Sequence, residues 1–144
     1  MKKLNEQATR IFCRILQRMD GQDYLKLKAG GYMPLTTEKA AFDIDTPWGK
    51  GYVISLCHYY EQNGDLMRDP EMCFIVADNR KQEHDYECIA IYPQMYRQDN
   101  MGVYEESIHI KDGKVTGSII IWQAAHALFA NSWLRNIRRQ GFLK

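Results

Sequence analysis

Two stretches, one near each end of the chain, repeat their apolar residues with the spacing of an amphipathic helix. In residues 4–19 the apolar positions fall at i, i+3, i+4 and i+7, and Gly21 follows where the helix should stop. Residues 118–139 show the same spacing, with Ser118 placed to cap the helix and Gly141 placed to end it. We therefore expect one helix near each end of the chain.

Between these helices, apolar residues alternate with polar ones in short runs separated by turn residues. This alternation is typical of β-strands, and Pro34 indicates that the strand containing it is bulged or lies at a sheet edge. The runs that we interpret as strands cover residues 23–28, 32–37, 50–61, 71–78, 84–97 and 103–110, and residues 40–45 are a candidate for a further short strand. Consecutive turns predict an antiparallel meander, which we expect to contain five or six strands.

An antiparallel sheet of this kind buries one face and needs a cover for it. The two amphipathic helices are the available cover, so we expect them to pack side by side across one face. The whole chain of 144 residues fits one domain and is long enough to fold around its own core. The predicted fold is therefore a single α+β domain over residues 1–144.

Charge is segregated along the chain. The net charge of +1 is the balance of +4 in residues 1–19, +5 in residues 114–144 and −8 in the residues between them. Ordinary solvated helix faces explain this pattern, and so does a basic surface that contacts nucleic acid. The arginines that would form such a surface are Arg10, Arg14, Arg18, Arg135, Arg138 and Arg139.

The apolar runs and the cysteines bear on the protein's environment. No apolar run approaches the roughly 20 residues that span a bilayer, and no signal-peptide pattern is present, so we expect a cytoplasmic protein without a membrane partner. The four cysteines are scattered and form no Cys-x-x-Cys pair. Buried free thiols are the expected state, and we expect neither a zinc site nor a cofactor.

Residues 58–72 contain one His, two Tyr, two Glu, two Asp, an Asn and an Arg. A hairpin turn needs only Asn63-Gly64, so this accumulation of acids and aromatics indicates a binding surface. A long polar hairpin loop without a function is the simpler alternative. If the neighbouring strands pair, His58 would converge with Glu61, Asp65, Asp69 and Glu71 to hold a divalent ion or to form an acid–base pair.

A second polar segment, residues 96–100, has a similar composition around a turn. Alternate turns of a meander fall at the same end of the sheet, so the two segments should form one composite surface. The candidate binding residues are His58, Tyr60, Glu61, Asn63, Asp65, Arg68, Asp69, Glu71, Arg97, Asp99 and Asn100. His126 lies on the apolar side of the last predicted helix, and no recognised catalytic motif is present.

Two strings are specific enough to compare with known families: Tyr-Glu-Gln-Asn-Gly-Asp-Leu at residues 60–66 and Asp-Pro-Glu-Met at residues 69–72. Residues 31–35 and 96–102 add to the comparison. From about Tyr24 to the last helix, the chain resembles an uncharacterised family of small bacterial proteins, a domain of unknown function. Members of that family are often encoded on plasmids, phages and conjugative elements. The resemblance implies a cytosolic accessory protein of a mobile element, acting on nucleic acid or on another protein, and it supplies no catalytic residues.

We therefore expect a non-enzymatic protein-interaction module with a protein partner that remains to be identified. Two alternatives stay open, namely a nucleic-acid-binding accessory protein that uses the basic helices and a metal-dependent hydrolase centred on His58.

Overall fold

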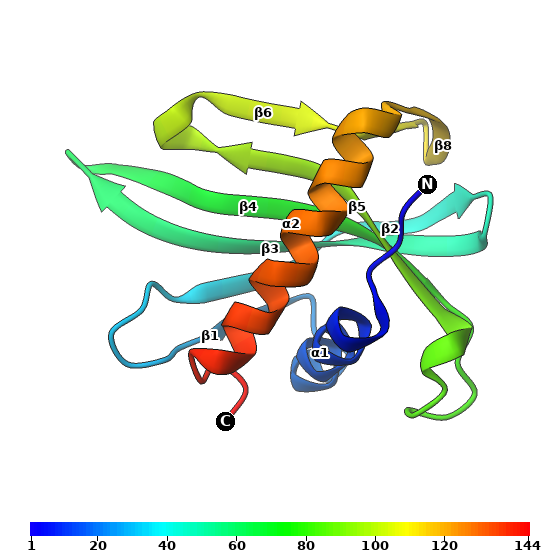
Figure 1. Cartoon of the computed structure of the whole chain (residues 1–144), viewed down its shortest axis with the longest axis horizontal. Helices are drawn as coiled ribbons and strands as arrows, with labels where there is room; N and C mark the ends of the chain where they lie inside the picture. The colour runs from blue at the N-terminus through cyan, green and yellow to red at the C-terminus, as the bar shows by residue number, and fades with distance from the viewer.

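Both predicted helices are present, one near each end of the chain (Figure 1). In the computed structural model, which describes residues 1–144, helix α1 spans Glu6–Met19 and helix α2 spans Ile120–Arg139. The side chain of Asn5 caps α1 by accepting a hydrogen bond from the backbone N–H of Ala8. Asp20 then ends α1 in a left-handed conformation, one residue before Gly21.

The predicted cap of α2 is wrong. Ser118 is the last residue of a strand, and Ile119 occupies the cap position without a side-chain hydrogen bond. Its own backbone N–H donates to the carbonyl of Ser107 instead. The start of α2 is thus set by a long-range contact rather than by a local cap.

The fold is α+β, as predicted, but the sheet has eight strands rather than five or six. The strands are β1 (Tyr24–Leu27), β2 (Leu35–Thr46), β3 (Gly49–Gln62), β4 (Asp65–Asp78), β5 (Ile89–Gln98), β6 (Val103–Glu106), β7 (Ile108–Lys111) and β8 (Lys114–Ser118). Two short 3₁₀ helices, η1 (Tyr86–Cys88) and η2 (Asp99–Met101), precede and follow β5.

Several strand boundaries differ from the prediction. The runs 32–37 and 40–45 belong to one strand, β2, and Pro34 lies just before it. Most of the predicted loop at residues 62–70 is strand, because β3 and β4 pair up to the turn at Asn63-Gly64. Both turn residues have positive φ angles, as the favoured two-residue hairpin turn requires.

The strand order is β6-β5-β4-β3-β2-β8-β7, with β1 also paired to β2. Strands β2 to β6 form the predicted antiparallel meander. The predicted last strand, however, is divided at Ser107 into β6 and β7, which stand at opposite ends of the strand order. The sheet curls so that β7 still contacts β5. The β7–β8 hairpin is joined to β2 by the parallel pairing of β8.

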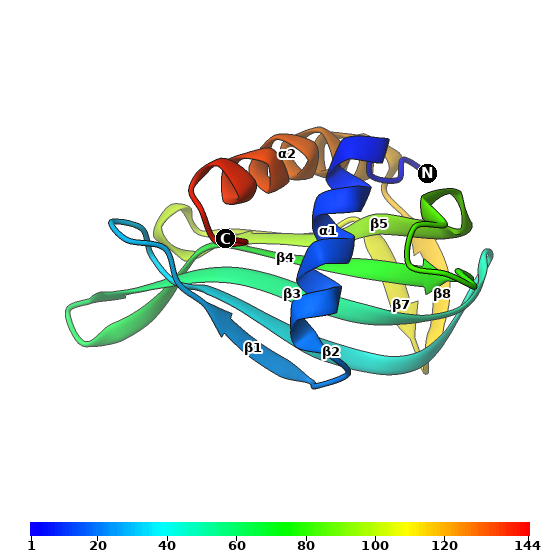
Figure 2. The same ribbon diagram turned by 90° about the horizontal axis from the view of Figure 1, so that it is seen from below.

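The two helices cover the same face of the sheet, as predicted (Figure 2). They contact each other, but they cross rather than lie side by side (Figure 1). The main core lies beneath them, where the ring of Phe12 from α1 meets that of Phe74 from β4 edge-on at 5.0 Å. We call this side of the sheet the helix face and the opposite side the outer face.

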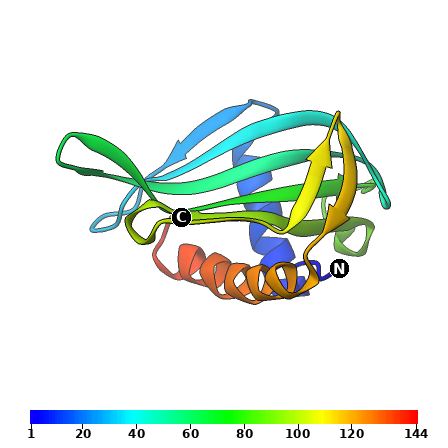
Figure 3. The same ribbon diagram turned by 90° about the horizontal axis from the view of Figure 1, so that it is seen from above.

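The prediction that only one face is buried is wrong. A second apolar cluster on the outer face includes Val53, Ile75 and Ile108, the alternate residues to those of the main core. Trp48 stacks on Tyr92 there, with ring centroids 3.6 Å apart. Figure 3 shows the β7–β8 hairpin on the side of the sheet opposite α2. The outer face is therefore apolar beneath this hairpin and polar toward the other end.

Candidate binding surface

The two polar turns lie at the same end of the sheet, which we call the hairpin end. Asp99, in η2, accepts hydrogen bonds from Arg68 at the start of β4, both from its backbone N–H at 2.9 Å and from Nη1 at 3.2 Å. The Nε of Arg97 donates to the other oxygen of Asp99 at 3.0 Å. The turns that the sequence placed together are thus joined through one carboxylate.

Glu71 extends this group of charges across the sheet. Its carboxylate accepts a hydrogen bond of 2.7 Å from Ser55 Oγ and lies 3.5 Å from Arg68 Nε. Glu71 and Arg97 are direct partners in the β4–β5 register, so both point to the outer face. We call Ser55, Arg68, Glu71, Arg97 and Asp99 the arginine–aspartate cluster.

The charges of the arginine–aspartate cluster support one another. The backbone N–H of Arg68 and the side chain of Arg97 hold the pKa of the Asp99 carboxyl below its usual value. Burial alone would lower the pKa of Arg68, but the charges of Asp99 and Glu71 outweigh it and raise that pKa. Asp99 and Arg68 therefore stay ionised at neutral pH.

A hollow of about 480 Å³ lies on the same face, beside the cluster. It is lined by Tyr24, Lys26, Pro34, Thr36, Glu38, Tyr59, Tyr60, Glu61 and Leu66. The strand register explains this gathering, because Lys26 pairs with Thr36 and Thr36 pairs with Cys57 across β1, β2 and β3. We call it the tyrosine hollow, after the three tyrosines among its lining residues.

Reactive groups near the hollow are held in their neutral forms. Burial raises the pKa of the Cys57 thiol to about 12, and it does the same for the Tyr59 hydroxyl, aided by the neighbouring Cys57. No group of three or more His, Cys, Asp or Glu side chains is arranged to hold a metal ion. The arrangement presents aromatic rings and fixed charges rather than a nucleophile or a base.

The predicted convergence of His58 with the acids is wrong. His58 is on the helix face, only 7% exposed, and its ring packs against those of Trp133 and Phe142. Its Nδ1 lies 3.1 Å from the carbonyl oxygen of Met33 and 3.3 Å from that of Pro34. Because α2 and the residues after it cover this part of the sheet, His58 is a core residue.

The other predicted residues occupy the rim of the hairpin end. Tyr60 and Glu61 line the tyrosine hollow, and Asn63 and Asp65 are exposed at the tip of the β3–β4 hairpin. Asp69 accepts a hydrogen bond of 2.9 Å from the side chain of Gln98, which again joins β4 to β5. Asn100 is exposed in η2.

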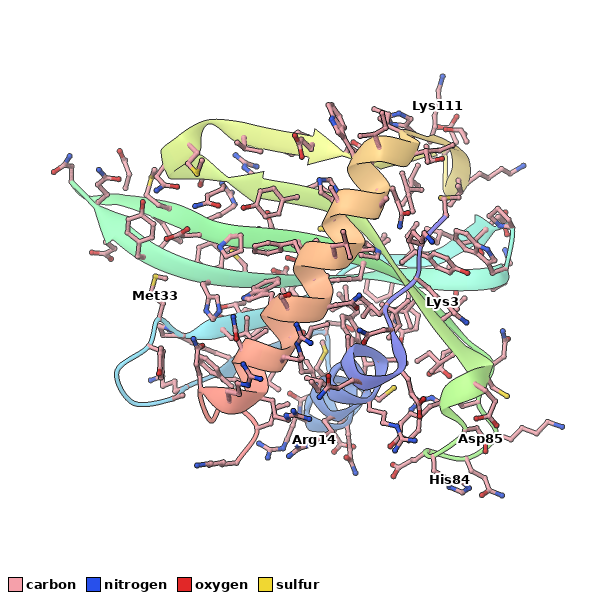
Figure 4. All side chains as sticks on the ribbon, in the orientation of Figure 1. Lys3, Arg14, Met33, His84, Asp85 and Lys111 are labelled. Carbon is pink, nitrogen blue, oxygen red and sulfur yellow. The ribbon has the colours of Figure 1, made fainter.

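The arginines of α1 make contacts within the molecule. Arg14, labelled in Figure 4, and Arg18 both donate to the carbonyl oxygen of Leu143, at 2.8 and 2.7 Å, and so bind the C-terminal residues. Arg10 pairs with Glu6 and lies over the ring of Tyr86. Among the arginines of α2, Arg135 donates to Ser132, whereas Arg138 and Arg139 are exposed.

Sequence reasoning missed Tyr24, Tyr59, Pro34 and Ser55 as parts of this surface. They come from three strand runs, since Ser55 and Tyr59 share β3, and only the strand register brings these runs together. Alternation along a strand predicts on which face of the sheet each residue lies. It does not predict which residues of the adjacent strands lie next to it.

Comparison with known families agrees with the expectation of a domain of unknown function. Residues 10–143 match the family described as Domain of unknown function (DUF6908). The chain belongs to this family. The DUF6908 match contains both the arginine–aspartate cluster and the tyrosine hollow. No curated protein and no solved structure matches the chain.

No helix in the structure is both long and apolar enough to cross a membrane.

Proposed function

We propose that this DUF6908 protein is a non-enzymatic protein-interaction module that binds its partner through the outer face of the hairpin end. The observation that supports this proposal is the tyrosine hollow lying directly beside the arginine–aspartate cluster. The resemblance to mobile-element proteins supports placing the interaction in the biology of a bacterial plasmid, phage or conjugative element.

The composition of the surface favours a protein partner. Tyrosine and arginine are enriched in protein interfaces and among the residues that contribute most to binding. The hollow offers tyrosine rings, Pro34 and the exposed side chain of Leu66 as an apolar floor, with Lys26, Glu38 and Glu61 around it. An apolar or aromatic side chain of the partner would be the anchor in the hollow, and the surrounding charges would fix its orientation.

The surface is also organised before binding. Asp99 joins β4 to η2 and β5, and the Asp69–Gln98 hydrogen bond joins the same two strands a second time. A surface held in this way loses little conformational freedom when a partner binds, so more of the contact energy contributes to affinity.

The chemistry of the surface argues against catalysis by its side chains. The thiol of Cys57 and the hydroxyl of Tyr59 are protonated at neutral pH, and His58 is enclosed on the other face. The carboxylates of Glu71 and Asp99 are bound by arginines and are not free to act as general bases.

Site-specific photo-crosslinking in the bacterial host would test the proposal. A photoreactive phenylalanine analogue at Tyr24, an exposed residue of the hollow, should give a discrete adduct with one protein, whereas the same analogue at Leu128, on α2, should not. The purified partner should then bind the wild-type chain with a Kd that Tyr24→Ala or Leu66→Ser raises at least about tenfold. Reversing the charge at Glu61 and Asp65 together should weaken binding as well.

Leu128→Ser is the matched control, since Leu128 is an exposed leucine like Leu66 but lies on the helix face of the molecule. Each variant's thermal unfolding should match that of the wild type, because all these side chains are at the surface. A Kd that is unchanged by Tyr24→Ala, Leu66→Ser and the charge reversal would show that this surface is not the binding site.

A further inference from the structure

The outward side of α2 is apolar although nothing in the molecule covers it. Ile121 is 81% exposed and Leu128 is 73% exposed, and the large side chains of Ile120, Trp122 and Phe129 are also at the surface. The inward side of the same helix is apolar too, since residues such as Ala130, Leu134 and Ile137 fill the main core. The exposed side of α2 is therefore apolar over residues 120–129, whereas a surface helix normally carries polar residues outward.

Every charged side chain in residues 114–144, the segment that contains α2, is basic. No charged Asp, Glu, Lys or Arg occurs between Lys114 and Arg135, and Arg138 and Arg139 follow at the end of the helix. The acid that contacts α2 from the sheet is Glu105, which is bonded to His126 at 2.8 Å.

The N-terminal segment adds two more basic residues beside α2. The backbone N–H of Lys2 donates to the side chain of Gln123 at 2.7 Å, and that side chain donates back to the carbonyl oxygen of Lys2 at 2.6 Å. The backbone N–H of Asn5 donates to Asn131 on the next turns of the helix. Lys2 and Lys3 are both exposed, and Figure 4 shows Lys3 on the segment leading into α1.

The fold thus converts a charge pattern along the chain into a charge pattern in space. Apart from Lys114 in β8, the basic residues of the two ends belong to the helices and their flanks, and the acidic middle of −8 forms most of the sheet. A second copy of the chain on α2 would bring two basic faces together. The charges therefore favour an anionic partner, and the exposed apolar side chains require one that also has an apolar layer.

The shape of the surface around α2 further limits which class of partner can bind it. The main cavities of the molecule are lined by α1, by strands β1 to β4 and by residues 78–89, and α2 contributes to none of them. Figure 2 shows α2 as a ridge along the outside of the molecule. A nucleic acid would pair with the arginines but leave the isoleucines and Leu128 in water, and a partner helix would fit a groove better than a ridge.

We propose that α2 docks on an anionic lipid bilayer, lying in the plane of the surface. Ile120, Ile121, Leu128 and Phe129 would enter the boundary between headgroups and acyl chains, with Trp122 at the same level. Lys2, Lys3, Arg138 and Arg139 would bind the anionic headgroups. The sequence alone predicted no membrane partner because it has no spanning segment, but binding at the surface requires none.

Vesicle co-sedimentation of the full chain at low salt tests this proposal. The protein should bind phosphatidylcholine vesicles containing about 30% phosphatidylserine and should not bind phosphatidylcholine alone. Ile121→Ser with Leu128→Ser should lower the partition coefficient at least about tenfold, and so should Arg138→Gln with Arg139→Gln. Binding should blue-shift tryptophan fluorescence in the wild type, and Trp122→Phe should remove that shift.

Leu66→Ser is the matched control, because it removes an equally exposed leucine from the hairpin end. It should leave vesicle binding unchanged, so failure of this proposal and failure of the proposed protein-binding surface are separable. Absence of binding to the anionic vesicles would overturn the proposal, as would binding that the serine variant does not reduce. Binding to duplex DNA but not to vesicles would assign the basic face to nucleic acid. A dimer that dissociates in the serine variant would assign the exposed side of α2 to a second copy.

Discussion

Replacing His58 with alanine tests directly whether this residue is part of the core or of a site. The imidazole fills space between Trp133 and Phe142, and its Nδ1–H is positioned to donate to the carbonyl oxygen of Met33. His58→Ala leaves a cavity and an unpaired carbonyl, so we expect the free energy of unfolding to fall by about 2–4 kcal/mol. Urea unfolding at pH 8, followed by the fluorescence of Trp133 and the other tryptophans, measures this change.

The pH dependence of stability gives a second test of the same reasoning. Burial lowers the pKa of His58, although the carbonyls of Met33 and Pro34 oppose this effect. Below about pH 6.5 the unfolded chain binds a proton at this residue that the folded chain excludes. The contribution of His58 to stability is therefore complete above that pH and declines as the pH falls through it.

His58→Gln serves as the control, since glutamine keeps an N–H donor but does not titrate. Between pH 8 and pH 5 the wild-type protein should lose more stability than this variant does. The reasoning would be refuted by a loss below about 1 kcal/mol in His58→Ala, or by identical pH profiles of the wild type and His58→Gln. Saturable binding of a divalent ion that disappears in both variants would instead restore the hydrolase alternative.

Three further predictions follow from the packing. Asp99→Ala should cost about 1–3 kcal/mol of unfolding free energy by thermal denaturation, because it leaves arginines unpaired, whereas Asp65→Ala at the hairpin tip should change it by less than about 0.5 kcal/mol. Gly51→Ala should cost about 1–3 kcal/mol because its Cβ would lie 2.8 Å from a backbone oxygen of β4, while Gly117→Ala, with ordinary contacts only, should cost less. Iodoacetamide at pH 8 should modify Cys88 alone in the folded protein, because the other three thiols are buried, and mass spectrometry should count four adducts in urea.

The helices and most of the strands could be predicted because their signals are local. The apolar spacing of residues 4–19 and 118–139 is set by which side of a helix faces the core, and that requirement is satisfied within a few turns. The Asn63-Gly64 turn could also be predicted, since its backbone conformation favours those two residues. The division of the last strand at Ser107 could not be predicted, because β6 and β7 form one alternating run in the sequence. Its two halves separate only because they pair with different strands.

The candidate surface was predicted in part. The order of turns in a meander predicted that the two polar turns lie at one end of the sheet, and the structure joins them there through Arg68 and Asp99, a contact that was not predicted. The prediction that His58 belongs to the polar site was wrong. Alternation shows that His58 and Leu56 lie on the same face of the sheet, but it does not show that the end of α2 covers that face. The tyrosine hollow combines residues from β1 to β4, so nothing within one segment identifies it.

The sequence by itself determined the types and approximate positions of the elements, the α+β class, the basic ends and the acidic middle. Each of these depends on residues close together along the chain. Only the tertiary structure decided that both sheet faces carry a core, that His58 is enclosed, and that the exposed side of α2 lies among basic charges. Those outcomes depend on strand register and on which helix covers which strands, and they are set by contacts between residues far apart in sequence.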